Sequence, residues 1–331
     1  MGVTRLLDSA EEAAALLRAG RLVAFPTETV YGLGASALDA NAIAGIFRAK
    51  GRPADNPLIV HVASVDDVAP LVVDVPPPAA RFMEAFWPGP LSIVLRRSEV
   101  LADGVAAGLD TVALRMPDHP AALAMLRAAG IPVAAPSANR SGRPSPTTWE
   151  AVMDDLDGRI DAVLKGGGAR VGLESTVVDC TTAEPVVLRR GSIGLADLRS
   201  IEPATRLAAS GELETGRSPG VRHPHYRPEG RVLLARADAP LPPGAAWLGL
   251  HPPSPDTAEF LRRVEVVPTV EDYARRLFAY FRTCEKEGIR DIVCEDLREP
   301  TSGPTASNTF PTVPESAIHS ALLDRLERAS H

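Results

Sequence analysis

One stretch, Lys50 to His61 (KGRPADNPLIVH), constrains the fold of this chain more than any other. The preceding segment AIAGIFRAK has helical spacing, and Pro53 disfavours the helical region for Arg52, so a helix should end here. Asn56 then begins an Asn-Pro turn before LIVHV, a short apolar run typical of a buried strand. A helix that leads directly into a buried strand indicates an α/β fold.

The two cations at the entrance to this strand have two possible roles. Positions i and i+2 of an extended segment share a face, so Lys50 and Arg52 should point the same way. They are either solvated charges beside a turn, as Lys and Arg usually are, or the cationic part of a ligand site. Taken alone, the stretch favours the first interpretation.

A second stretch, Ala135 to Pro146 (APSANRSGRPSP), favours the ligand site. Ser137 and Asn139 again stand at i and i+2, directly after the apolar run GIPVAA, and two arginines and Ser145 follow. Two strand-to-loop exits therefore carry complementary groups, cations on one and a hydroxyl and an amide on the other. Such a set suits a polyphosphate, which needs charge neutralisation together with oriented neutral donors.

Other strand ends add candidates. In RLVAFPTETVYGLG, a polar cluster of Thr27, Glu28, Thr29 and Tyr31 follows a buried strand, where α/β folds place ligands. Thr27 by itself is better explained as a turn-capping hydroxyl. Arg115 ends the apolar run TVALR, and its side chain either reaches water or enters the same ligand site.

Length and charge exclude several classes of protein. With 331 residues, two domains are expected. A net charge of −7 is unlike a non-specific nucleic-acid binder, so any basic patch must be local. The three cysteines form no CxxC motif, which predicts reduced thiols and a cytoplasmic protein. No apolar run approaches the ~20 residues that a membrane span requires.

The later part of the chain is organised differently. The run Gly166–Gly168 fits no nucleotide-binding motif and is interpreted as a turn. From about residue 198 to 231 no strands are predicted, and the Pro-rich segment 218–230 is typical of a linker. Tyr226 in this linker belongs either to a solvated connector or to a flap that contacts a ligand. His223 and His225 have metal-ligand spacing but no third ligand, so no metal site is predicted.

Residues 231–331 alternate strands with helices, which predicts a small parallel sheet. No catalytic constellation is visible there, so we expect this part to scaffold or regulate.

At this point the motifs resemble a known family. In order, FPTETVYGLG, KGRPADNPLIVH, WPGPLS, ALRMP, APSANRSGRPSPT, ESTVVD and LRRGSI resemble the YrdC-like domain of threonylcarbamoyl-AMP synthases, over about Leu16 to Leu195. The remainder resembles the longer, two-domain form. The resemblance implies an α/β fold: a YrdC-like twisted mixed sheet with flanking helices and a basic concave groove (1–203), a linker or flap (204–230), and a smaller Rossmann-like parallel α/β domain (231–331).

The resemblance also implies an activity. A nucleotidyltransferase of this family would condense L-threonine, bicarbonate and ATP, the last with Mg²⁺, into threonylcarbamoyl-AMP and pyrophosphate. Partner transferase proteins would use the adenylate to modify tRNA, and contact of this chain with tRNA is left open.

Family site residues carry over onto this sequence in three groups. The catalytic group comprises Lys50, Arg52, Ser137 and Asn139. The ATP-binding group comprises Arg52, Asn56, Thr111, Ser137, Ser145, Arg189 and Tyr226. The threonine-binding group comprises Thr29, His61, Arg115, Ala135 and Ser175.

The sequence departs from the family pattern in places. Ser92 stands where threonine is usual, Arg222 and His223 replace a Lys-Tyr pair, and segment 299–315 looks inserted. Competing interpretations are an RNA-binding module without catalysis, which an aromatic content of 5% disfavours, and a carbamoyl-transferring relative of hydrogenase maturation. The latter type carries acylphosphatase and cysteine-rich zinc segments that this sequence lacks. A P-loop ATPase is excluded because the loop is missing.

Overall fold

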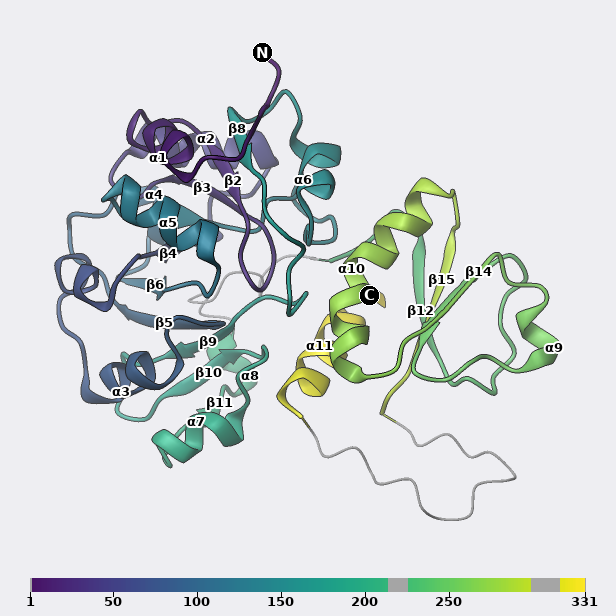
Figure 1. Cartoon of the computed structure of the whole chain (residues 1–331). Helices are drawn as coiled ribbons and strands as arrows, with labels where there is room; N and C mark the ends of the chain where they lie inside the picture. Colours follow the sequence, from purple (N-terminus) through teal and green to yellow (C-terminus); the bar gives the residue numbers. More distant parts are fainter. Residues whose placement is uncertain (1, 214–225, 299–315, 331) are drawn as a thin grey trace. The chain divides into compact units, whose positions relative to one another are not determined.

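The computed structural model describes residues 2–213, 226–298 and 316–330 (Figure 1). The chain divides into two compact units. The first comprises Met1–Ser141 and Ser145–His223, and the second comprises Pro224–His331 together with the short segment Gly142–Pro144. A few residues downstream of the Ser137–Asn139 pair therefore belong to the second unit. Among the described residues, no helix is both long and apolar enough to span a membrane.

The first unit is built on an 11-stranded sheet with the order β1-β8-β2-β3-β7-β4-β6-β5-β9-β10-β11. The sheet is mixed, because β4 pairs in parallel with β6 and antiparallel with β7. The predicted mixed sheet is thus confirmed. Its strands are β1 (Arg5–Leu7), β2 (Val23–Phe25), β3 (Gly32–Ser36), β4 (Ile59–His61), β5 (Leu91–Arg96), β6 (Thr111–Arg115), β7 (Val133–Ala135), β8 (Ala162–Leu164), β9 (Thr176–Asp179), β10 (Val186–Arg189) and β11 (Arg206–Leu207).

Helices cover both faces of this sheet. The side chain of Ala24 in β2 joins a core cluster with α2 and α3, whereas Val23 and Phe25 join another with α1 and α5, because successive strand side chains point to opposite faces. Figure 1 shows α1 and α5 side by side. The helices are α1 (Ala10–Arg18), α2 (Ala40–Lys50), α3 (Pro77–Phe86), α4 (Asp103–Ala106), α5 (Pro120–Ala129), α6 (Trp149–Leu156), α7 (Leu195–Ile201) and α8 (Ser210–Leu213), with 3-10 turns η1 (Val65–Asp67) and η2 (Ala69–Leu71).

Helix α2 ends where the sequence predicted. At its start, the Asp39 carboxylate accepts hydrogen bonds from two backbone N–H groups of the first turn. At its end, Gly51 takes the left-handed conformation (φ 62°), and the Arg52 N–H donates to the Phe47 carbonyl. This cap places Lys50 in the last turn of α2, next to the loop that leads into β4.

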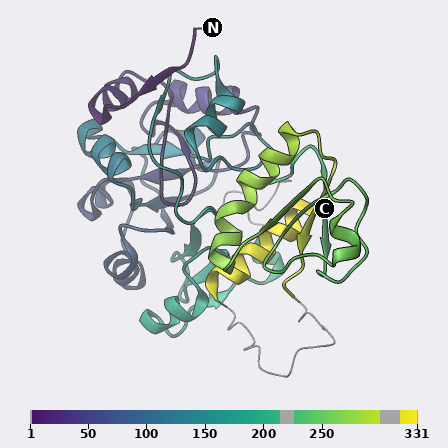
Figure 2. The ribbon, with the colours of Figure 1, turned by 45° about the vertical axis from the view of Figure 1, so that its right-hand side comes forward.

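The second unit contains a 4-stranded sheet with the order β12-β15-β13-β14, in which every pairing is parallel. The predicted parallel sheet is confirmed. Helices α10 and α11 lie side by side in the views of Figures 1 and 2. The elements are β12 (Arg231–Ala235), β13 (Ala246–Gly249), α9 (Pro255–Ala258), β14 (Arg263–Val266), α10 (Val270–Lys286), β15 (Asp291–Glu295) and α11 (Ala317–Ser330).

Not every strand was predicted from the sequence. The expectation that no strand lies between residues 198 and 231 is wrong, because β11 pairs with β10. Strand β14 (RVEV) was not predicted either. It is an edge strand in which the charged Arg263 and Glu265 are half-buried and the two valines are exposed, so its sequence pattern does not indicate which face is buried.

Candidate active site

Lys50 joins the two stretches that the sequence analysis singled out. Its ammonium group donates to the main-chain carbonyl of Ser137 at 2.5 Å and also to that of Asn139, and the side chain is buried. The Ser137 hydroxyl donates to the Asn139 amide oxygen at 2.5 Å. The end of α2 and the loop after β7 therefore meet at one place, as predicted.

Arg52 organises the loop between α2 and β4. Its Nε donates to the Asn56 carbonyl at 3.3 Å and its Nη2 to the Pro57 carbonyl at 3.1 Å. Arg52 and Asn56 are both buried. These hydrogen bonds hold the turn in shape. They also hold the Arg52 guanidinium in the loop that follows Lys50.

Strand pairing places three of the threonine-site candidates on neighbouring strands. His61 lies opposite Arg115 across the parallel β4–β6 pair, and Ile59 of β4 lies opposite Ala135 of β7. The Arg115 side chain is buried and its Nε donates to the Gly89 carbonyl at 3.2 Å. Of the two fates considered for Arg115, the one in which its side chain reaches water is not observed.

His61 is uncharged at neutral pH. Burial, together with the nearby Arg115 guanidinium, lowers the pKa of His61 to about 3. Its Nδ1 lies 3.2 Å from the Ile59 carbonyl, and the backbone of Val133 is a second neighbour of the ring. The Phe25 ring meets the imidazole edge to face at 5.6 Å. A neutral imidazole in this position can accept a hydrogen bond without adding charge.

Ser175 is the centre of a buried hydroxyl and guanidinium cluster. Its hydroxyl lies 2.8 Å from that of Ser92, and Arg189 donates to the Ser175 carbonyl and hydroxyl, both at 3.0 Å. All three residues are buried. Ser92, where the family has threonine, keeps the hydroxyl that this contact needs.

The turn after β2 is fixed by Thr27. Its hydroxyl donates to the Val30 carbonyl at 2.6 Å, accepts from the Val30 N–H at 3.2 Å, and lies 2.9 Å from the Thr29 hydroxyl. Thr27 is thus a turn-capping residue, as predicted. The Thr29 side chain is fully buried beside it.

Two of the ATP candidates belong to other parts of the first unit. The Ser145 hydroxyl donates to the Glu174 carboxylate at 2.6 Å. The Thr111 hydroxyl, at the start of β6, is buried and makes no hydrogen bond to the described residues. Sequence reasoning did not assign Glu174, although it lies in the ESTVVD motif.

Tyr226 belongs to the second unit in this structure. Its ring stacks on Phe278 at 5.4 Å, with 21° between the planes, and the Arg325 guanidinium lies 5.1 Å from its centre. Tyr226 is 4% exposed. Its contact with ATP stays a prediction. Arg222, His223, His225 and the segment 299–315 lie outside the described residues.

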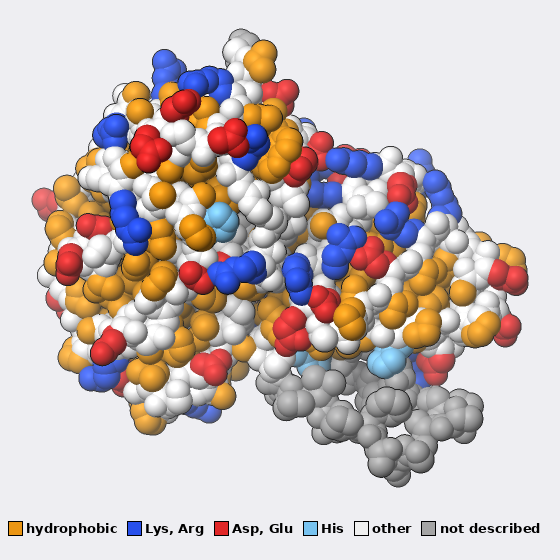
Figure 3. Space-filling model, in the orientation of Figure 1, with side chains coloured by type: hydrophobic (Ala, Val, Ile, Leu, Met, Phe, Trp, Pro, Cys, Tyr) orange, Lys and Arg blue, Asp and Glu red, His pale blue; other side chains and the backbone are white. Residues whose placement is uncertain are grey.

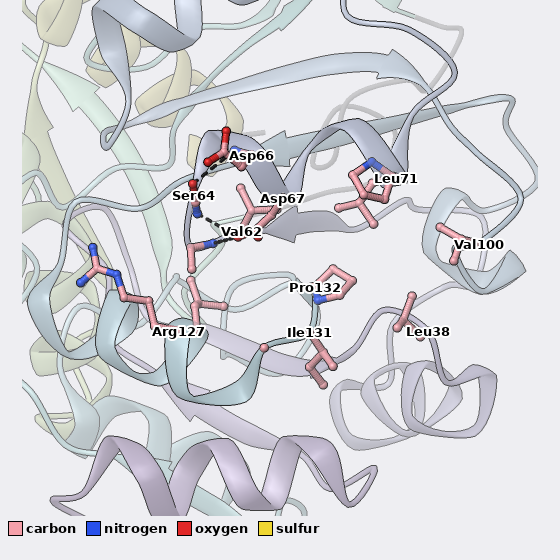
Figure 4. Close-up of a pocket in the computed structure, with 14 residues that line it drawn as sticks. Leu38, Val62, Ser64, Asp66, Asp67, Leu71, Val100, Arg127, Ile131 and Pro132 are labelled. Carbon is pink, nitrogen blue, oxygen red and sulfur yellow. Dashed lines mark hydrogen bonds between the residues drawn. The ribbon is translucent and has the colours of Figure 1, made fainter.

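A hollow of about 510 Å³ lies elsewhere in the first unit, and none of the predicted site residues lines it. Figure 4 shows apolar side chains such as Val62, Leu71 and Ile131 around it, while the Arg127 guanidinium reaches away from its centre. Its polar rim is occupied by an internal cap, in which the Asp67 carboxylate accepts from the Ser64 N–H at 2.9 Å.

Comparison with protein families covers nearly the whole chain. Residues 15–191 match the Sua5/YciO/YrdC family, described as "Telomere recombination". Residues 193–331 match the family described as "Threonylcarbamoyl-AMP synthase, C-terminal domain".

Individual relatives agree with these families. A threonylcarbamoyl-AMP synthase of Pyrococcus abyssi is 40% identical over 89% of this chain and 91% of its own length. The Bacillus subtilis enzyme of the same name is 38% identical over 96% of this chain and 92% of its own. Among solved structures, P. abyssi Sua5 complexed with L-threonine matches with a TM-score of 0.86 and 36% identity, covering 99% of this chain and 98% of that one.

Proposed function

The chain belongs to the threonylcarbamoyl-AMP synthase family, and we propose on that basis that its first unit condenses L-threonine, bicarbonate and ATP into threonylcarbamoyl-AMP and pyrophosphate. The observation that carries this proposal is the Lys50 ammonium group bound to the Ser137–Asn139 loop. That contact gathers a buried cation, a hydroxyl and an amide at one place, which is what a polyphosphate requires.

Threonine would bind along the strands next to this place. Arg115 is buried at the end of β6 and would bind the substrate carboxylate with its planar guanidinium. The neutral His61 would contact the threonine hydroxyl. Thr29, Ala135 and Ser175 would complete the subsite, with Ser175 oriented by Arg189.

ATP would bind where the Lys50 and Arg52 charges neutralise its phosphates. Asn56, Thr111, Ser137, Ser145 and Arg189 would supply further contacts, and the Thr111 hydroxyl has hydrogen-bonding capacity that no described residue uses. Tyr226, whose ring stacks on Phe278 in this structure, would add a further contact to the nucleotide.

The reaction is nucleotidyl transfer. The threonine amine first forms an N–C bond to the carbon of bicarbonate, a C–O bond of bicarbonate breaks, and water leaves, which gives the N-carboxylate of threonine. An oxygen of this carbamate would form a bond to the α-phosphorus of ATP while the bond from that phosphorus to the β-phosphate bridging oxygen breaks and pyrophosphate leaves. Such a step depends on positioning and charge stabilisation, with no need for a protein nucleophile. Lys50 and Arg52 would stabilise the charge that develops on the phosphates.

Mg²⁺ is proposed as part of the substrate MgATP. The described residues contain no group of three or more His, Cys, Asp or Glu side chains that could hold a metal ion. Mg²⁺ commonly binds phosphate oxygens and water with few protein ligands, so a phosphate-borne ion fits a site whose protein groups are cations and neutral donors. We further propose that the adenylate passes to partner transferase proteins that modify tRNA.

The alternative of an RNA-binding module predicts a broad surface of Lys and Arg. On the face of the first unit drawn in Figure 3, basic side chains are dispersed among acidic and apolar ones. The net charge of −7 also favours an enzyme with a local cationic site over a nucleic-acid-binding surface.

One assay tests the proposal. Purified protein is incubated with labelled threonine, bicarbonate and MgATP, and the adenylate and pyrophosphate are separated and measured. We expect both products in equal amounts, and neither when bicarbonate is omitted. Pyrophosphate release that ignores bicarbonate, or no product at all, would contradict the proposed reaction.

A further inference from the structure

Glu28 and Arg115 form a buried ion pair in the first unit. Glu28 Oε1 lies 2.7 Å from Arg115 Nη2, and the two side chains are 2% and 5% exposed. The contact is short but lacks the alignment of a hydrogen bond, so both Glu28 oxygens and this nitrogen have no hydrogen-bond partner among the described residues. Buried polar atoms almost always have such a partner, and an exception needs an explanation, such as a ligand.

The backbone holds the Glu28 carboxylate in this position. Glu28 lies in the turn that Thr27 closes, and its carbonyl accepts from the Val171 N–H at 2.8 Å. The neighbouring Thr29 carbonyl accepts from the Gly172 N–H at 3.1 Å. The carboxylate is therefore presented by the braced turn after β2 and faces Arg115 at the end of β6.

The guanidinium nitrogens of Arg115 have different neighbours, and one of them remains available to a ligand. Its Nε donates to the Gly89 carbonyl and its Nη2 faces Glu28. Its Nη1 makes no hydrogen bond to the described residues. Unlike Nη2, it is not completely buried. One edge of the guanidinium can thus bind a carboxylate while another stays beside Glu28.

We propose that Glu28 is a specificity residue that accepts the α-ammonium group of L-threonine while Arg115 binds its carboxylate. This inference rests on the proposed function. The ammonium and carboxylate of an amino acid are attached to one carbon, so the groups that bind them must lie side by side, as Glu28 and Arg115 do. The free acceptor positions on Glu28 match the N–H donors of the ammonium group.

Charge balance favours this arrangement. The Glu28–Arg115 pair is neutral, and so is a zwitterionic amino acid, so binding adds no net charge to a buried site. An acid that lacks the amine would add an unpaired negative charge, which is costly to bury. Once the nitrogen becomes a carbamate it is no longer cationic, so Glu28 acts on threonine binding and not on adenylate formation.

The test compares two ligands by calorimetry on the full chain, L-threonine and 2,3-dihydroxybutanoate, in which a hydroxyl replaces the amine. Wild type should bind threonine roughly tenfold to a hundredfold more tightly than the analogue, the range for a charged hydrogen bond. Glu28→Gln should lose that preference by weakening threonine alone. In steady-state assays its KM for threonine should rise while kcat and the affinity for ATP stay unchanged.

The controls separate the possible outcomes. Glu84→Gln, an exposed residue of α3, should match wild type in every measurement. Equal weakening of both ligands in Glu28→Gln would overturn the proposal, because Glu28 would then only orient Arg115; unchanged threonine affinity would overturn it too. If the variant does not fold, the comparison of the two ligands on the wild-type protein tests the proposal. Equal affinity for threonine and the analogue would contradict an ammonium site. Failure of wild type to bind threonine would instead refute the proposed function.

Discussion

In the second unit, the Glu285 carboxylate binds Arg143 at 2.6 Å through Oε2, and its Oε1 accepts the Glu229 N–H at 2.9 Å. The Glu285 side chain is 7% exposed. Arg282 adds a second anchor by donating to the Pro144 carbonyl at 2.5 Å. One helix, α10, therefore fixes both the Gly142–Pro144 segment and the backbone at Glu229, near the end of the predicted linker.

Glu285→Gln should loosen this anchor. The amide keeps the shape but removes the charge, and a hydrogen bond to a charged group contributes roughly 1.5–3 kcal/mol. Amide exchange measured by mass spectrometry on the full chain should become faster in peptides that contain residues 142–144 and 229. Glu259→Gln, an exposed carboxylate in the same unit, should exchange like wild type. Identical exchange in both variants would show that the ion pair does not restrain these segments.

Lys50→Ala should reduce the rate of adenylate formation by about a hundredfold or more, the usual effect of removing one donor from a preorganised charged site. The measurement is kcat with labelled threonine, together with thermal unfolding to confirm that the variant folds.

Arg48→Ala provides the matched control for Lys50. Arg48 is an exposed cation in the same last turn of α2, so its removal changes the charge equally without touching the Ser137–Asn139 loop. Should both variants lose the same activity, a general charge effect would replace the proposed role of Lys50.

His61 predicts a pH dependence of stability with a defined sign. Its pKa is about 3 in the folded chain against an ordinary value of 6.5, because burial and Arg115 disfavour its charged form. Between these values the unfolded chain binds a proton that the folded chain does not. The contribution of His61 to the free energy of unfolding should therefore fall by about 1.4 kcal/mol per unit as pH drops below 6.5, and stay constant above it.

Urea unfolding of wild type and His61→Asn at pH 7 and pH 5 isolates this effect, since the carboxylates of the two proteins titrate alike. The difference in unfolding free energy should shrink or reverse at pH 5. Parallel pH profiles would show that His61 is already charged or that it is not buried.

Tyr226→Ala should destabilise the second unit, because it removes a buried ring stacked on Phe278. Deleting a buried aromatic side chain costs about 3–5 kcal/mol. Tyr226→Phe keeps the stacked ring and should lose much less. If Tyr226 also reaches the nucleotide, as proposed, the alanine variant should bind ATP more weakly in calorimetry as well. Normal stability together with weaker ATP binding would mean that the stack on Phe278 is not the main resting position of Tyr226.

The sequence predicted the meeting of Lys50 with Ser137 and Asn139 because local signals determine it. Helical spacing followed by Arg-Pro ends α2, and the apolar run GIPVAA ends in the loop that carries the hydroxyl and the amide. Both signals are local, because each depends on residues that are neighbours in the chain. The order of the strands then brings the end of α2 next to the loop after β7.

The acidic partners could not be predicted in the same way. Glu28 and Glu174 stand in polar loops, where a carboxylate is usually solvated, and only the tertiary structure places them beside Arg115 and Ser145. The packing of Tyr226 has the same origin, since Phe278 is distant in the sequence and nothing local indicates the stack.

The order of strands in the second sheet has a consequence for synthesis on the ribosome. The last strand to be made, β15, occupies an inner position between β12 and β13. Until β15 is made, β12 and β13 each lack the strand that pairs with both of them in the finished sheet. A product that stops before Asp291 therefore leaves β12 without its hydrogen-bonded partner among the described strands of this sheet.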